Sequence, residues 1–195
     1  LGFIWQGNMV DLGTLGGFAS WGYGVNDNNV AVGSAITASA GRRAFIYRTS
    51  MQEVTLGSVF ESEARDINNL DQVVGWVKAT QSSAARAFLW DNGVRTDVGA
   101  LGSGAFSYAE AINDHRVIVG RSDLDASGTA TRAFRWQNGV MQALPSLGGL
   151  KTSAMAINND GTIVGWSHDT QGRTRAVIWR NGQVYQQSYE RGTPT

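Results

Sequence analysis

The chain holds only two histidines and no cysteine, which narrows the chemistry open to it. A Ser-His-Asp hydrolytic site needs a histidine as its base, so His115 or His168 would have to supply it. Cysteine nucleophiles and thiolate metal sites are excluded. We therefore treat His115 as a candidate catalytic base, with the adjacent Asp114 as the group that would orient its ring.

Asp66 is a further candidate catalytic residue. The segment around it, Glu61-Ser62-Glu63-Ala64-Arg65-Asp66, aligns with later segments that have Ala111 and Ala156 in its place. A carboxylate on a crowded strand could take part in acid-base chemistry. A structural ion pair with its charged neighbours is the alternative interpretation.

Three residues are candidate ligand-binding groups. Arg116 follows His115 in a turn where a matching later turn has Asp160-Gly161, so a bulky cation replaces a turn glycine. Glu110 precedes this turn by a few residues, and the third group, His168, stands in a different loop. Solvated surface positions remain the alternative for both histidines. We expect the two rings to emerge on opposite faces of a sheet, too far apart to share zinc, so neither a metal nor a cofactor is predicted.

These residues lie within a repeated sequence. Aromatic anchors recur at successive spacings of 42, 43, 46 and 43 residues, and four asparagines each precede a glycine by seven positions. The anchors are Trp5, Tyr47, Trp90, Trp136 and Trp179, and the asparagines are Asn26, Asn68, Asn113 and Asn158. We interpret residues 1–195 as one repeat domain with copies at approximately 1–42, 43–85, 86–131 and 132–174 and a partial copy at 175–195.

Each copy predicts four short strands. In the third copy, strands at 86–90 and 94–98 flank Asn92-Gly93, a dipeptide that favours a type I′ hairpin turn. Further strands are expected at 107–113 and 117–122. Four strands per unit of about 43 residues is the spacing of a β-propeller blade. The predicted fold is an all-β propeller of four to five blades with incomplete terminal hairpins, and a β-solenoid is the alternative.

The number of predicted hairpins is odd, which leaves two arrangements open. The first and last hairpins could join into one blade, giving five blades. Four blades could instead leave a spare hairpin that docks elsewhere or on a second chain, so a dimer through unpaired terminal hairpins is a possible partner arrangement.

Charge and composition limit the partners. Sixteen basic and sixteen acidic residues cancel, which argues against nucleic acid and against an anionic membrane surface. No window holds the run of apolar residues that a membrane span needs. The glycine-rich links lack a following Gly-Lys-Ser/Thr, so we reject nucleotide binding.

The recurring segments Arg-Ala-Phe-x-Trp, Leu-Gly-x-Leu-Gly-Gly, Ser-x-Ala-x-Ala-Ile-Asn and Ile-Val-Gly-x-Ser resemble the HAF-type extracellular repeat family of bacteria. The resemblance covers essentially the whole chain and is best at 11–17 and 156–165. The histidine of the family pattern is replaced by arginine, at Arg43, Arg86, Arg132 and Arg175. The resemblance implies a secreted or surface-displayed protein, such as an autotransporter passenger segment.

Two functions follow as hypotheses. The first is a binding or display module for a surface glycan, a lipid or a host protein, because the loops are rich in Ser, Thr, Gly and Arg and no catalytic set converges. The second is a secreted hydrolase of esters or lipids, with cleavage of itself from an anchor as one option. It rests on the resemblance and on the unusual His115-Arg116 turn. Recurring residues are assigned to the scaffold, since chemistry needs a residue once.

Overall fold

The structure, a computed structural model, describes residues 1–187, which form strands and turns without a helix. Within this range no helix has the length and apolar character needed to span a bilayer. The strands are β1 Phe3–Trp5, β2 Met9–Asp11, β3 Gly16–Val25, β4 Ala31–Thr37, β5 Arg42–Tyr47, β6 Met51–Glu53, β7 Glu61–Ile67, β8 Val73–Lys78, β9 Arg86–Asp91, β10 Val94–Gly99, β11 Ser107–Ile112, β12 Ile118–Asp123, β13 Thr131–Gln137, β14 Val140–Ala143, β15 Gly148–Ile157, β16 Ile163–Asp169, β17 Thr174–Arg180 and β18 Gln183–Gln186.

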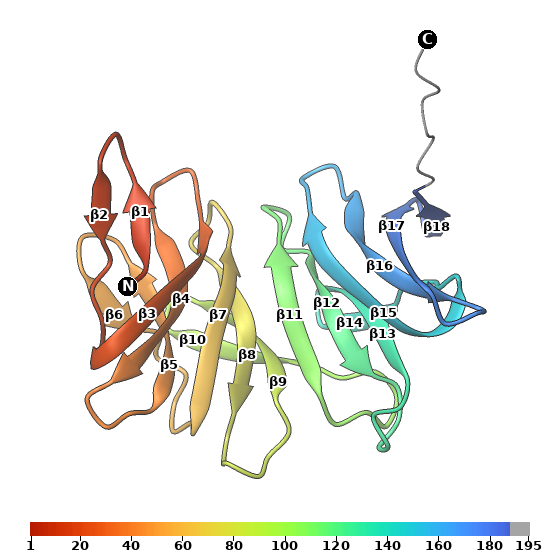
Figure 1. Ribbon diagram of the computed structural model, residues 1–195, viewed down its shortest axis with the longest axis horizontal. Coiled ribbons are helices and arrows are strands. Elements are labelled where there is room, and N and C mark those ends of the chain that lie inside the picture. The colour runs from red at the N-terminus through yellow and green to blue at the C-terminus, as the bar shows by residue number, and fades with distance from the viewer. Residues whose placement is uncertain (188–195) are drawn as a thin grey trace.

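The strands form four antiparallel blades in chain order: β3 to β6, β7 to β10, β11 to β14 and β15 to β18. The last two are joined by one parallel pair, Thr131 with Lys151. The inner strands β3, β7, β11 and β15 lie side by side across the front of Figure 1, and the sheets do not close into a ring. The strands predicted for the third copy are present at the expected positions.

Each blade begins with the Ser-x-Ala strand and ends with the hairpin whose first strand contains Arg-Ala-Phe, half a repeat later than the copies drawn from the sequence. The hairpin β17–β18 completes the fourth blade, whereas β1–β2 forms a separate two-stranded sheet packed against the first blade. Of the two predicted arrangements, the structure has four blades and a spare hairpin. The end of the predicted partial copy, residues 188–195, lies outside the described residues.

The predicted hairpin turns are present between the third and fourth strands of the blades. Asn92 and Gly93 have φ angles of 48° and 88°, and Asn181 and Gly182 repeat this conformation at 51° and 75°. Two successive positive φ angles define the type I′ turn, which matches the right-handed twist of the flanking strands.

The recurring glycine of the second strand is fixed by a bulge in the first. In β7 the pairing shifts between Ala64 and Asp66, so Arg65 is an extra residue without a partner in β8. A Cβ at Gly75 would overlap the carbonyl oxygen of Glu63. The same bulge and the same close approach occur in the other three blades, at Gly33, Gly120 and Gly165. Only glycine therefore fits this position.

The hydrophobic core lies between blades. Phe45, Phe88 and Phe134 are each fully buried, and the cluster around Phe88 combines residues of the first two blades. Burial on both sheet faces explains why the Arg-Ala-Phe strand is apolar on both sides of its pleat.

Two ladders of hydrogen bonds tie each blade to the next. In one, the Ala44 amide donates to Ser62 Oγ at 2.9 Å, and the Ala87 amide donates to Ser107 Oγ at 2.9 Å. In the other, each turn asparagine donates from Nδ2 to the carbonyl oxygen of the next one, as from Asn68 to Asn113 at 3.0 Å. The recurring serines and asparagines thus serve the scaffold, as the sequence analysis predicted.

Candidate functional site

The candidate site is the front of the four inner strands, which we call the inner-strand surface. It is formed by the two variable positions of each Ser-x-Ala-x-Ala segment, and the second of these is the bulge residue. Bulges are enriched beside functional sites because they re-aim a side chain. The variable positions are Trp21 and Tyr23 in β3, Glu63 and Arg65 in β7, Tyr108 and Glu110 in β11, and Ser153 and Met155 in β15.

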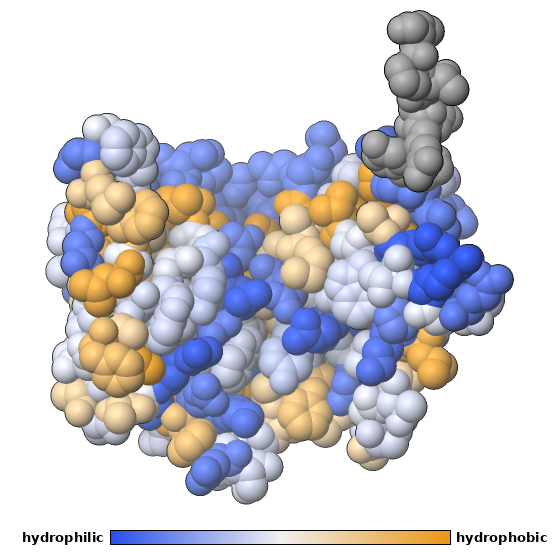
Figure 2. Space-filling model, viewed as in Figure 1, coloured by the Kyte–Doolittle hydropathy of each residue, from blue (hydrophilic) through white to orange (hydrophobic). Residues whose placement is uncertain are grey.

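A chain of ion pairs crosses this surface through three blades. Arg42 Nη1 lies 2.7 Å from Glu63 Oε2, and Arg65 Nη1 lies 3.0 Å from Glu63 Oε1. Arg65 Nε then lies 3.0 Å from Glu110 Oε2, and Arg121 Nη1 lies 3.3 Å from Glu110 Oε1. Each buried carboxylate is therefore held between two guanidinium groups, and Figure 2 shows hydrophilic residues gathered over the middle of this face.

Aromatic rings flank the same guanidinium groups. Arg65 lies 4.9 Å above the ring of Tyr23, and Arg121 lies 4.5 Å above the ring of Tyr108. Trp76 of β8 meets Tyr108 edge to face at 6.0 Å. Cation–π contacts of this kind fix the rings and the cations relative to each other while part of each ring stays open to solvent.

Two groups of the surface have shifted pKa values. Burial alone would lower the pKa of Arg65, but Glu110 and Glu63 outweigh it and raise that pKa above its usual value. Burial raises the pKa of Tyr108, against the opposing effect of Arg121. Arg65 stays a cation and Tyr108 stays a neutral hydroxyl at physiological pH, so the surface offers fixed donors, acceptors and rings.

Among the predicted site residues, Glu110 belongs to this surface, where it joins Arg65 to Arg121 in the ion-pair chain. Asp66 lies beside it on β7, where Oδ2 accepts a hydrogen bond of 2.9 Å from the Ile112 amide of the next blade. Burial raises the pKa of the Asp66 carboxyl, although the amides of Ile112 and Ile67 oppose the shift. Asp66 therefore joins two blades through a backbone contact.

The turn between β11 and β12 contains His115, Asp114 and Arg116. His115 is exposed, and the Asp114 carboxylate accepts hydrogen bonds from Asn69 and from Asn159 in the two neighbouring blades. The amide of Asn69 and the side chain of Asn159 lower the pKa of Asp114. Both Asp114 oxygens thus serve contacts between blades, and no hydrogen bond joins this carboxylate to the His115 ring within residues 1–187.

Arg116 occupies a left-handed position, with φ at 60°, where the matching turn has Gly161 at 79°. Its Nη2 lies 3.6 Å from Asp91 Oδ2 of the preceding blade. The positions that correspond to it in the first two blades, Asn29 and Asp71, have the same left-handed conformation. The turn therefore imposes this backbone on whatever residue stands there.

His168 is the next-to-last residue of β16 and lies 5.5 Å from the ring of Trp166. Its neighbour Asp169 accepts hydrogen bonds from Arg173 and Arg175 at 2.7 and 3.1 Å. The structure thus brings Glu110 and Asp66 to neighbouring inner strands, whereas His115 and His168 belong to different blades and different strand ends.

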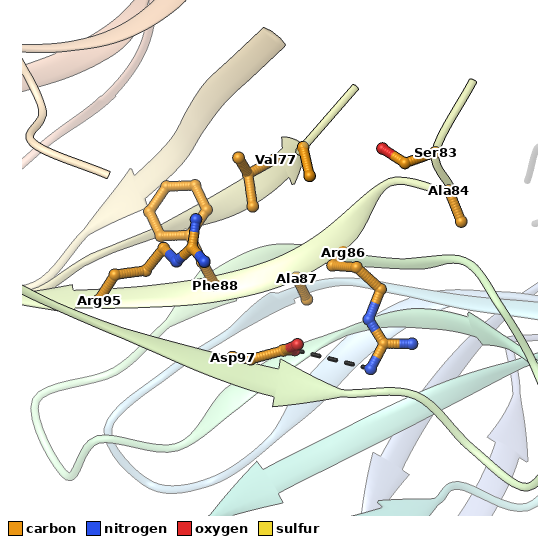
Figure 3. A pocket seen from close by; sticks show the side chains of 9 residues that line it. Val77, Ser83, Ala84, Arg86, Ala87, Phe88, Arg95 and Asp97 are labelled. Atoms are coloured by element: carbon orange, nitrogen blue, oxygen red, sulfur yellow. Dashed lines mark ion pairs between the residues drawn. The ribbon is translucent and has the colours of Figure 1, made fainter. Parts of the chain in front are cut away.

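A pocket of about 350 Å³ lies at the far edge of the second blade. In Figure 3, Arg95 and Phe88 line one side, and Asp97 pairs with Arg86 at 3.7 Å on the other. The predicted site residues do not line this pocket, and its wall is largely apolar. Within residues 1–187, no group of three or more His, Cys, Asp or Glu side chains is arranged to hold a metal ion.

Most of this surface was not predicted from the sequence. Glu110 was among the candidate site residues, whereas Tyr23, Arg65, Tyr108 and Arg121 were not. The available signal was variability within the repeat, because the scaffold residues recur while the positions between them change in every copy. The bulge that turns those positions outward has no sequence signal of its own except the glycine that faces it.

Comparisons with known proteins support the fold. A family model described as "Protein of unknown function (DUF3466)" matches residues 15–101. No curated protein matches the chain. The β-propeller domain of the Trilobed protease from Pyrococcus furiosus, described as having an open velcro topology, is similar in structure, with a TM-score of 0.56 and 11% sequence identity over 90% of this chain.

The chain spans 56% of the length of that propeller structure. At this level of identity the similarity establishes the fold and carries no information about activity. The predicted β-propeller architecture is confirmed: the chain is an all-β propeller whose four-stranded blades do not close into a ring.

Proposed function

We propose that the chain is a binding module that takes up a carbohydrate on its inner-strand surface. The observation that carries the proposal is the run of aromatic rings and Arg-Glu pairs across three adjacent inner strands. This function agrees with the binding role favoured by the sequence.

The chemistry of the surface suits a sugar. A sugar ring has flat C–H faces that pack against aromatic rings, and hydroxyl groups that form hydrogen bonds with both cations and carboxylates. Tyr23 is 41% exposed and Trp21 is 40% exposed, so both rings have faces available for packing. The ion pairs hold the polar groups in place before a ligand arrives, which lowers the entropy lost on binding.

We also propose that the module acts outside the cell, secreted or displayed on a surface. This part of the proposal is supported by the resemblance of the repeats to an extracellular family. It is independent of the ligand class, and fractionation of the native source with an antibody against residues 1–187 tests it separately.

A glycan array tests the binding proposal. Tyr108→Ala and Tyr23→Ala should each lower retention of the bound glycan at least about tenfold, since aromatic anchors dominate such contacts. Tyr185→Ala is the matched control, because Tyr185 is 52% exposed but stands on the outer strand β18. If the wild-type protein binds no glycan, or if all three variants bind equally well, the proposal is wrong.

A further inference from the structure

The hairpin β1–β2 occupies the place of the outer half of a blade. The Gly2 amide donates to Ser20 Oγ at 3.0 Å, in the same way that Ala44 and Ala87 donate to the serines of the following blades. The Leu12 amide donates a hydrogen bond to the Gly2 carbonyl, and later blades have an equivalent bond. β1 and β2 therefore correspond to the third and fourth strands of a complete blade.

Among residues 1–187, no further strands join β1 and β2 in their sheet, and β1 shows the consequence. Phe3 is 57% exposed, whereas the residues at the same position in the next three blades, Phe45, Phe88 and Phe134, are fully buried. In those blades the phenylalanine lies opposite the recurring glycine of the second strand, as Phe88 lies opposite Gly75. Only β2 pairs with β1 among the described residues, so the other edge of β1 is open.

The neighbouring inner strand β3 is uncovered in the same region. Val25 is 56% exposed, whereas Ile67 and Ile112, at the same position in later blades, are 4% and 5% exposed. A cleft of about 570 Å³ lies between β1 and β3, and both Trp5 and Val25 line it. The cleft thus has an apolar wall along β1, a mixed apolar and polar wall along β3 and the turn after it, and an open strand edge.

The hydrogen-bond ladder between blades also stops here. The carbonyl oxygens of Asn68, Asn113 and Asn158 each accept a bond from the asparagine side chain of the preceding blade. The Asn26 carbonyl accepts only the local bond from the Asn29 amide within residues 1–187. Because the ladder runs from each side-chain amide to the next carbonyl, this end of the array presents the Asn26 carbonyl as an acceptor on the side of the cleft.

We propose that this cleft receives a β-hairpin of the same repeat type, from a polypeptide segment outside residues 1–187. Its second strand pairs with the open edge of β1 and places a glycine opposite Phe3. Its turn asparagine donates to the Asn26 carbonyl, and its first strand covers Val25. Strand addition to an open edge, with side-chain pockets that select the sequence, is an established mode of peptide recognition.

A graft tests the proposal on the full chain. Residues 61–85, which contain β7, β8 and the loop that leads to β9, are placed directly before Leu1. Leu1 aligns with Arg86, so the register of the second blade continues into β1. We expect hydrogen exchange at residues 1–12 to slow by at least about a hundredfold and Tm to rise by about 5–10 °C.

The control graft has the same length but carries Asn68→Ala and Gly75→Val in the grafted copy. It should leave exchange at residues 1–12 and the Tm close to those of the ungrafted chain, because a valine at the grafted Gly75 overlaps the grafted Glu63 carbonyl and prevents the hairpin from forming. The proposal is wrong if the first graft gives no protection of β1, or if both grafts protect it equally. It is also wrong if the ungrafted chain protects β1 by dimerising in sedimentation experiments, since the occupant is then a second copy.

Discussion

The middle of the blade array and its two ends have the same repeat but very different burial. Phe88 in the second blade is fully buried, whereas Phe3 in the terminal hairpin is 57% exposed. At the other end, Val164 is 41% exposed, although Val74 and Val119 at the same position are fully buried. The difference shows that a blade does not bury its own core. Stability comes from the contact between neighbours, as in other repeat proteins.

The largest expected difference between the middle and the end of the array concerns the recurring phenylalanine. Phe88→Ala should lower the free energy of unfolding by about 3–5 kcal/mol, because it leaves a cavity between two blades. Phe3→Ala should cost less than about 1 kcal/mol, since the side chain already contacts solvent. Urea unfolding monitored by tryptophan fluorescence measures both. Equal costs for the two variants would contradict the view that neighbours supply the core.

The asparagine ladder gives a smaller difference. Asn68→Ala removes hydrogen bonds to the Asn113 carbonyl and to Gln72 from a buried site, and should cost about 2–3 kcal/mol. Asn158→Ala at the exposed end removes the turn contact to the Thr162 amide and should cost about 1 kcal/mol. Thermal unfolding of both variants separates the part of the cost that arises between blades from the part that arises within the turn.

The smallest expected effect depends on pH. Because burial raises the pKa of Asp66, the unfolded chain releases this proton at a lower pH than the folded chain does. The native state therefore loses stability as pH rises through the raised pKa. Asp66→Asn keeps an oxygen for the Ile112 amide, and should raise Tm at pH 7 but not below about pH 4.

The exposed Asp160→Asn is the control for this pH dependence. It should change Tm equally little at both pH values. If Asp66→Asn raises Tm by the same amount at pH 4 and at pH 7, the charge of Asp66 does not affect the stability of the fold.

The sequence predicted the blade and its strands well, because hairpin turns such as Asn92-Gly93 and the recurring Phe and Trp positions follow from local geometry and burial. It did not predict where a blade begins. The repeat has the same period whichever strand is counted first, and the pairing of the second strand of each blade with the third, as of β8 with β9 and β16 with β17, reveals the grouping.

The candidate site was less predictable. Glu110 and Asp66 stood out by residue type, but the partners of Glu110 come from two different strands, with Arg65 on β7 and Arg121 on β12 far apart in sequence. The histidines were chosen as candidate site residues because imidazole can act as a base. That property does not indicate where in the fold the side chain lies. The sequence does contain the variable residues that lie between the recurring ones. Only the β-bulge in the structure shows that these variable residues share one surface.

The central claim is that ligand binding belongs to the variable inner-strand residues and not to the loops or to the histidine turn. A hydrogen-exchange footprint tests it most directly, with the best-retained oligosaccharide from the glycan array added at saturation. We predict slower exchange at residues 18–25, 61–67 and 107–112, with little change at 113–117 or in the outer strands. Protection confined to the turn around His115, or to the outer-strand pocket beside Arg95, would contradict the account.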